Sequence, residues 1–177
     1  MSPGRARDHE LLDALESMEG VAIEQSVWRA LRAGRDALSG RPSGGRWDPG
    51  TFDVIYFSLD PLGARAELYF HLSRQPVFPS RAEFVLHEVA VETRRTLRFA
   101  DLTELAPLGV NPEEYPGILY PRTQEIGDAA AFLGFDGFIA PSARWDCLNL
   151  VVFTGNLASD ALELVSSVPI DWSEHRR

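Results

Sequence analysis

Residues 44–71 constrain the fold more than any other stretch, because they combine a glycine-rich loop, a short strand and a well-started helix. The loop reads Gly-Gly-Arg-Trp-Asp-Pro-Gly, and residues 54–59 form an apolar, β-favouring run of strand length. Asp60 followed by Pro61 predicts a helix start, with an acid at the N-cap and proline in the first helical position.

On that helix, Glu67 shares one face with Ala64 and His71 because of their i, i+3, i+7 spacing. The opposite stripe is expected to face a core and consists of Leu62, Ala66, Tyr69 and Phe70. The unit therefore brings a guanidinium (Arg46), a phenol (Tyr56) and a carboxylate (Glu67) together. The alternative is a solvated Glu67 and a structural Arg46.

The length of 177 residues predicts a single domain, residues 1–177, with a full-sized core. Further strands are expected at 84–91 and 96–99, at 137–140, at 148–153 and near 162–170, and a helix at 121–133. With strands and helices that do not alternate strictly, the predicted fold class is α+β.

The charge of the chain narrows the possible partners. Its 26 acids and 17 bases give a net charge of −9, which disfavours direct binding of nucleic acid. All the bases are arginine, so Schiff-base chemistry and a Walker-type lysine are excluded. Arginine is left as the strong cation for a phosphate or carboxylate, which it holds bidentately.

The cysteine and histidine residues limit the cellular compartment and the metal chemistry that are expected of the chain. Cys147 is the single cysteine, so no intrachain disulfide can form, and residues 1–19 do not resemble a signal peptide. No stretch reaches the roughly 20 apolar residues of a membrane span. These features predict a reduced, soluble, cytoplasmic protein without membrane association. The histidines show no metal-ligand spacing, so no metal is expected.

Two other segments hold candidate site residues. Arg29 lies inside an apolar strand segment. It is either an arginine at a strand edge with its head group in solvent or, if it faces a cleft, a residue that clamps an anion. The long loop 34–50 carries Trp47, whose large ring predicts burial and hence an ordered loop.

An ordered set of short motifs between residues 27 and 153 resembles the RES-domain family, named for its arginine, glutamate and serine. Asp48 departs from the family pattern, which tends to have asparagine after the tryptophan, and residues 75–120 match no motif. The matching pieces are Trp28-Arg29, Gly45-Arg46-Trp47, Tyr56-Phe57-Ser58, Ala66-Glu67, Gly137-Phe138-Ile139-Ala140-Pro141-Ser142-Ala143-Arg144 and Asn149-Leu150-Val151-Val152-Phe153.

The resemblance implies an ADP-ribosyltransferase-like fold, with short strands in two small packed sheets and flanking helices. It implies the toxin of a bacterial toxin–antitoxin pair that cleaves NAD+ by hydrolysis or phosphorolysis, with NAD+ as substrate and no cofactor. The implied partner is an antitoxin with a helix-turn-helix part, which blocks the toxin's cleft in a hetero-oligomer.

Residue chemistry agrees with an NAD-cleaving catalytic set of Glu67, Arg29 and Ser142. Nicotinamide leaves as a neutral base, so the reaction needs a carboxylate that faces an oxocarbenium-like sugar. Glu67 is expected to supply it and to hold a ribose hydroxyl. Ser142 is expected to bind the ligand or orient Glu67, or else to be a capping serine.

The expected substrate-binding residues are Arg46, Tyr56 and Ser58. Arg46 and Arg29 together would clamp the pyrophosphate as planar forks. Tyr56 would stack on the nicotinamide ring, unless it is a core tyrosine of the strand.

Two other functions share these residues. A mono-ADP-ribosyltransferase would use the same site on a protein acceptor, and a non-catalytic module would bind an anion in the arginine-lined cleft. Loops 34–50 and 106–120 show no apolar or basic cluster for docking a protein, so water or phosphate is the favoured acceptor.

Overall fold

The computed structural model describes residues 6–173. In chain order its elements are α1 (His9–Glu16), β1 (Val21–Arg32), β2 (Val54–Ser58), α2 (Pro61–Ser73), β3 (Phe84–Arg98), α3 (Leu102–Leu105), the 3-10 helix η1 (Ala106–Leu108), α4 (Pro121–Phe132), β4 (Gly137–Pro141), β5 (Leu148–Phe153), the 3-10 helix η2 (Thr154–Asn156) and β6 (Leu162–Pro169).

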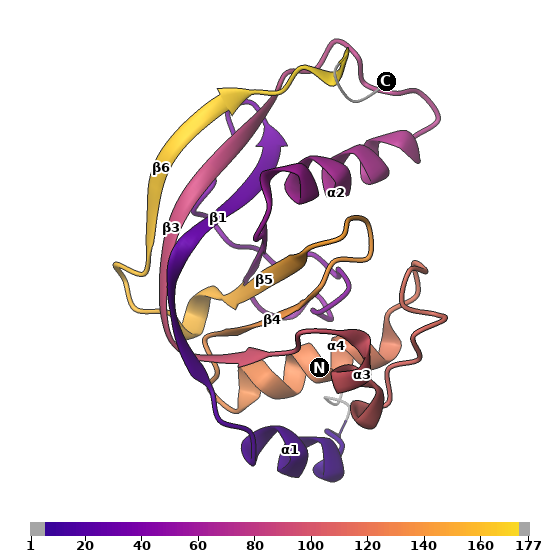
Figure 1. The fold of residues 1–177 in the computed structure, drawn as a ribbon, viewed down its shortest axis with the longest axis vertical. Coiled ribbons are helices and arrows are strands. Elements are labelled where there is room, and N and C mark those ends of the chain that lie inside the picture. The colour runs from indigo at the N-terminus through magenta and orange to yellow at the C-terminus, as the bar shows by residue number, and fades with distance from the viewer. Residues whose placement is uncertain (1–5, 174–177) are drawn as a thin grey trace.

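The strands form one sheet that closes on itself (Figure 1). Its order is β1-β2-β5-β4-β3-β6, and β1 also pairs with β3. The strands β1 to β5 therefore make a barrel, and β6 pairs with β3 beside it. A mixed helix and strand fold is therefore confirmed, whereas two small packed sheets are not. Long strands explain the closure: β1 has 12 residues and β3 has 15, enough for each to pair with more than one neighbour.

The prediction of separate strands at 84–91 and 96–99 is wrong, because β3 runs unbroken from 84 to 98. The residues between the two predicted strands, 92–95, are all polar. Asp136 instead holds this segment extended, since its carboxylate accepts from the backbone N–H of Arg94 at 2.6 Å and of Arg95 at 3.1 Å.

Strand alternation divides the apolar residues between two cores. One lies inside the barrel and takes Val27, Phe57, Val89, Ile139 and Leu150 from its five strands. The other joins the outer strand faces to α1, α3 and α4, for example through Phe138, Phe153 and Ile126. Neighbouring residues of one strand thus face different cores. Only polar side chains on the same face of the sheet can therefore come together.

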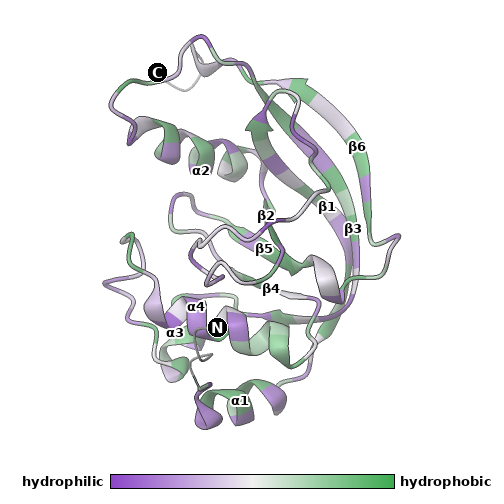
Figure 2. Ribbon diagram, turned by 180° about the vertical axis from the view of Figure 1, so that it is seen from behind, coloured by the Kyte–Doolittle hydropathy of each residue, from purple (hydrophilic) through white to green (hydrophobic). Residues whose placement is uncertain are grey.

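The helices cover different parts of the barrel. In Figures 1 and 2, α2 lies beside the upper part of β1, while α1, α3 and α4 gather at the opposite end with β4 and β5 between. The predicted start of α2 is confirmed, since its N-cap Asp60 accepts from Leu62 N at 2.7 Å, and the helix expected at 121–133 is α4, which ends at Phe132 shortly before Gly134 at φ 83°. Among residues 6–173, no helix combines the length and apolar character needed to cross a bilayer.

Candidate active site

The glycine-rich loop before β2 is organised around the carboxylate of Asp48, which has no exposed surface. One oxygen accepts from the backbone N–H groups of Ser43, Gly44 and Gly50, at 2.9–3.2 Å. The other accepts from Gly45 N and from the hydroxyls of Ser43 and Tyr56. Burial alone would raise the pKa of Asp48, but these hydrogen bonds outweigh it and the pKa is lowered.

Tyr56 ties this loop to β2. Its hydroxyl donates to Asp48 and accepts from the backbone N–H of Trp47 at 3.0 Å. Burial, followed by the neighbouring Asp48 carboxylate, raises the pKa of Tyr56, so the phenol stays protonated. Trp47 is 3% exposed and packs its ring edge on Phe138, which confirms the predicted burial. Arg46 is thereby presented from an ordered loop.

Close approach of α2 to the sheet fixes the position of Glu67. A Cβ on Gly63 would lie 2.4 Å from Ser58 Oγ and 2.5 Å from Cys147 Sγ, so only glycine fits. The buried residues of the helix are Gly63, Ala64, Ala66 and Leu72, whereas Leu62 of the predicted core stripe is 49% exposed. Apart from Leu72 near its end, the helix thus packs on the sheet through small residues.

Glu67 is half-buried, and one of its oxygens meets two donors from the other half of the chain. Oε1 accepts from Ser142 Oγ at 2.9 Å and from Asn149 Nδ2 at 3.2 Å. Ser142 Oγ in turn accepts from the backbone N–H of Arg144 at 3.1 Å, which fixes its direction. Within residues 6–173, the hydrogen bonds to this carboxylate all end on Oε1, so Oε2 is available to a ligand.

Two guanidinium groups converge beside this carboxylate on one stretch of backbone. Arg46 donates to the carbonyl oxygens of Tyr115 and Gly117 and lies between the rings of Tyr115 and Tyr120, 4.8 and 4.7 Å from their centroids. Arg144 donates to Pro116 O at 2.7 Å and also reaches Gly117 O, at 3.5 Å. Burial, and then the charge of Arg46, lower the pKa of Arg144.

The structure does not bring Arg29 to Glu67. Trp28 is the cross-strand partner of Ser58, and such partners share a sheet face, so Arg29 points to the opposite face, that of Val27 in the barrel interior. Its guanidinium donates to the carbonyls of Ala37 and Ser39, at 3.0 and 3.1 Å, and burial lowers its pKa.

Ser58 lies beneath α2 rather than beside the two arginines. It is 2% exposed, and its hydroxyl donates to the carbonyl of Asp60 at 2.8 Å, next to Cys147. Burial raises the pKa of the Cys147 thiol, which keeps it protonated. Both residues therefore support the start of α2.

Three residues of the site escaped the sequence interpretation. Asn149 and Arg144 stand in the quoted motif pieces but carried no role, and Tyr115 lies in a segment without a motif. Asn149 had a usable signal, because it is the one amide in a strand that is otherwise apolar. Tyr115 had none, since its burial and its bond to Pro141 O depend on tertiary packing.

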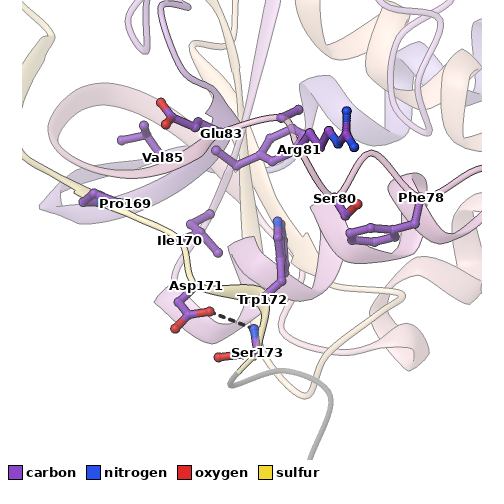
Figure 3. A pocket seen from close by; sticks show the side chains of 12 residues that line it. Phe78, Ser80, Arg81, Glu83, Val85, Pro169, Ile170, Asp171, Trp172 and Ser173 are labelled. Carbon is purple, nitrogen blue, oxygen red and sulfur yellow. Dashed lines mark hydrogen bonds between the residues drawn. The ribbon is translucent and has the colours of Figure 1, made fainter.

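A separate cavity of about 630 Å³ lies on another part of the molecule, between residues 78–85 and 169–173 (Figure 3). Trp172 and Arg81 project into it, and Asp171 accepts from Ser173 N at 2.9 Å. Glu67 and its partners do not line it. Within the described part of the chain, no three His, Cys, Asp or Glu residues gather as metal ligands.

The arrangement can hold an anionic, sugar-containing ligand. Two arginine forks suit phosphate oxygens, and a carboxylate with one open oxygen can accept from a hydroxyl or face a developing cation. Both phenols near it stay protonated, since burial also raises the pKa of Tyr115. Their hydroxyls are already bonded to Asp48 and to the carbonyl of Pro141, so they can contact a ligand through their rings and do not act as bases.

Comparisons with known proteins agree with this geometry. The family model described as RES domain matches residues 26–173. The chain is 26% identical over 180 residues to proteins named NAD(+) phosphorylase MbcT from Mycobacterium bovis and Mycobacterium tuberculosis, covering 93% of this chain and 92% of theirs. Its fold is similar to a chain in the crystal structure of the M. tuberculosis MbcT–MbcA toxin–antitoxin complex, with a TM-score of 0.86, 24% identity and 97% of both chains covered.

Proposed function

This chain belongs to the RES-domain family, and on that basis we propose that it cleaves the nicotinamide–ribose bond of NAD+ as the toxin of a bacterial toxin–antitoxin pair. The observation that carries the proposal is the half-satisfied carboxylate of Glu67. Its Oε1 is fixed by Ser142 and Asn149, while Oε2 is open beside two arginines. The names of the curated relatives, NAD(+) phosphorylases, support the same substrate.

Cleavage of the glycosidic bond requires little acid–base chemistry from the protein. The bond between the ribose C1″ and the pyridinium nitrogen breaks, and its electron pair neutralises the nitrogen. Glu67 then faces the positive charge that develops on the sugar, and Oε2 accepts a hydrogen bond from a ribose hydroxyl. The donors on Oε1 hold the carboxylate in place and aim Oε2 at this position.

The remaining residues bind and orient NAD+. Arg46 holds the pyrophosphate in exchange for the backbone carbonyls that it contacts in this structure. The ring of Tyr56 stacks on the nicotinamide, since its hydroxyl is already committed to the loop. Ser58 acts indirectly, because its hydroxyl supports the start of α2. Arg29 has a structural role, because it binds the carbonyl of Ala37.

The family membership extends to the fold and the partner. We assign the barrel to the ADP-ribosyltransferase-like folds and treat residues 1–177 as one RES-type unit. An antitoxin with a helix-turn-helix part would cover the Glu67 site and supply the DNA binding that a chain of net charge −9 lacks. Both proteins would act in the cytoplasm. The solved complex of the similar chain with MbcA supports an antitoxin partner.

Incubation of the purified protein with NAD+ tests the proposal. We expect release of free nicotinamide together with ADP-ribose or ADP-ribose-1″-phosphate. A labelled protein band in a cell lysate, absent with Glu67→Gln, would instead identify a mono-ADP-ribosyltransferase. NAD+ binding by calorimetry without any nicotinamide release would identify a non-catalytic anion-binding module.

A further inference from the structure

Arg144 lies directly against the helix that carries Glu67. Its guanidinium carbon is 3.5 Å from the ring centroid of Phe70, which stands three residues after Glu67 on α2. Its bonds to the carbonyls of Pro116 and Gly117 use two of the five N–H donors of an arginine. Donors therefore remain for a ligand at the edge of the site.

One hydroxyl group connects the backbone of Arg144 to the carboxylate. Arg144 N donates to Ser142 Oγ at 3.1 Å, and Ser142 Oγ donates to Glu67 Oε1 at 2.9 Å. Arg46 has no comparable connection, since it reaches the site from the glycine-rich loop and lies between two tyrosine rings. The backbone of Arg144 is thus fixed beside Glu67 and its guanidinium lies against Phe70 of the same helix, whereas the contacts of Arg46 described above go to residues 115–120.

Arg46 and Arg144 together carry more positive charge than the carboxylate of Glu67 can neutralise. The ion pairs within residues 6–173 join Arg7 to Asp128 and Arg122 to Asp8 and Glu125, so neither Arg46 nor Arg144 has a carboxylate partner within 4.0 Å. Both instead reach the same carbonyl oxygen, that of Gly117. Two unpaired guanidinium groups beside one carboxylate favour more than one anionic group.

The geometry of NAD+ separates the two positions. Its pyrophosphate is attached to C5″ of the ribose, at the opposite end from C1″, where the acceptor attacks. The guanidinium that lies against the helix of Glu67 is therefore suited to the acceptor, and the one presented by the glycine-rich loop to the pyrophosphate. We infer that Arg144 recruits inorganic phosphate as the acceptor and so determines the choice between phosphate and water, an inference that rests on the proposed cleavage of NAD+.

The step balances without another reactant. The bond from C1″ to the pyridinium nitrogen breaks and leaves its electron pair on nicotinamide. A phosphate oxygen then donates an electron pair to C1″ and forms ADP-ribose-1″-phosphate, and the proton of hydrogen phosphate stays on the ester or passes to water. With water as the nucleophile, the product is ADP-ribose and one proton goes to solvent.

Product ratios test this role. Wild type and Arg144→Gln are incubated with NAD+ over a range of inorganic phosphate, and both products are measured beside free nicotinamide. For Arg144→Gln we expect the KM for phosphate to rise about 10- to 100-fold, as for a lost charge-assisted contact. At a fixed phosphate concentration, the ratio of ADP-ribose-1″-phosphate to ADP-ribose should fall in this variant, whatever its total rate of nicotinamide release.

Arg74→Gln is the matched control, because Arg74 also lies over Phe70, at 5.5 Å, but is exposed at the end of α2. It should keep the wild-type phosphate response. Should Arg144→Gln fail to fold, Arg144→Lys replaces it, and we expect a raised KM for phosphate because lysine lacks the bidentate fork.

The outcomes separate this inference from the proposed function. A wild-type phosphate response retained in the Arg144 variant, or lost equally in Arg74→Gln, would overturn the role of Arg144. A wild type that releases nicotinamide without any effect of phosphate would overturn it as well, yet would leave NAD+ cleavage in place. Absence of nicotinamide release from the wild type would reject the proposed function itself.

Discussion

Asp48 and Glu67 stand on either side of β2 in the sequence and use their charges in opposite ways. Asp48 is fully buried and accepts six hydrogen bonds, so both of its oxygens are saturated and the loop closes around it. Glu67 is half-buried and accepts two, both on Oε1. A saturated carboxylate stabilises structure, whereas a half-saturated one keeps an oxygen for a ligand. The number and placement of donors therefore distinguish the two roles better than residue type does.

Glu67→Gln is expected to have the largest effect, and on activity alone. Glutamine keeps the shape but removes the charge that faces the developing cation, so NAD+ turnover should fall about 10²- to 10³-fold. The melting temperature should change little, because Oε2 has no partner to lose within residues 6–173. Nicotinamide release and thermal melting measured together check both expectations, and a variant with wild-type turnover would remove Glu67 from the mechanism.

Asp48→Ala should show the reverse pattern. Losing the carboxylate leaves several buried donors unsatisfied, and we expect the free energy of unfolding to fall by about 3 kcal/mol. Denaturant unfolding measures this loss, with Asp53→Ala as the control, because Asp53 lies nearby with an exposed side chain. Equal stability of the two variants would mean that the loop does not depend on Asp48.

Arg46 and Arg29, which the sequence analysis assigns to the pyrophosphate, should also differ in whether their loss affects binding or stability. Arg46→Ala should weaken NAD+ binding by about 1.5–3 kcal/mol, with only partial rescue by lysine. Arg29→Ala should mainly reduce stability, because its bonds go to the carbonyls of Ala37 and Ser39. Calorimetric titration with NAD+ distinguishes the two roles. An equal loss of affinity in both variants would place Arg29 in the binding site.

Acid should affect the Asp48 loop in a defined direction. The folded pKa of Asp48 is lowered, so its stabilisation is complete above the unfolded value near 3.8 and disappears as the pH falls through the folded value. Asp48→Asn should therefore unfold with a weaker pH dependence below about pH 4, and a curve parallel to wild type would contradict this assignment.

Local chemistry allowed the helix of Glu67 and the burial of Trp47 to be predicted from sequence. Asp60 and Pro61 start α2 whatever surrounds them, and a large ring in a glycine-rich loop needs a core. The closed barrel was not predictable, because it depends on β1 pairing with β3 across the chain. The face that Arg29 occupies was not predictable for a similar reason, since the choice of strand face is settled by the partner strands rather than by the local sequence.

The separation of the site's two halves along the chain has a consequence for synthesis. Ser142 and Asn149 follow Glu67 by 75 and 82 residues. At about 5–20 residues per second, a ribosome adds Glu67 about 4–16 s before it adds Asn149. During that interval β5 does not yet exist to pair with β2, so Glu67 lacks both of the donors that orient it. A nascent chain that ends before β5 therefore lacks the oriented carboxylate on which the proposed activity depends.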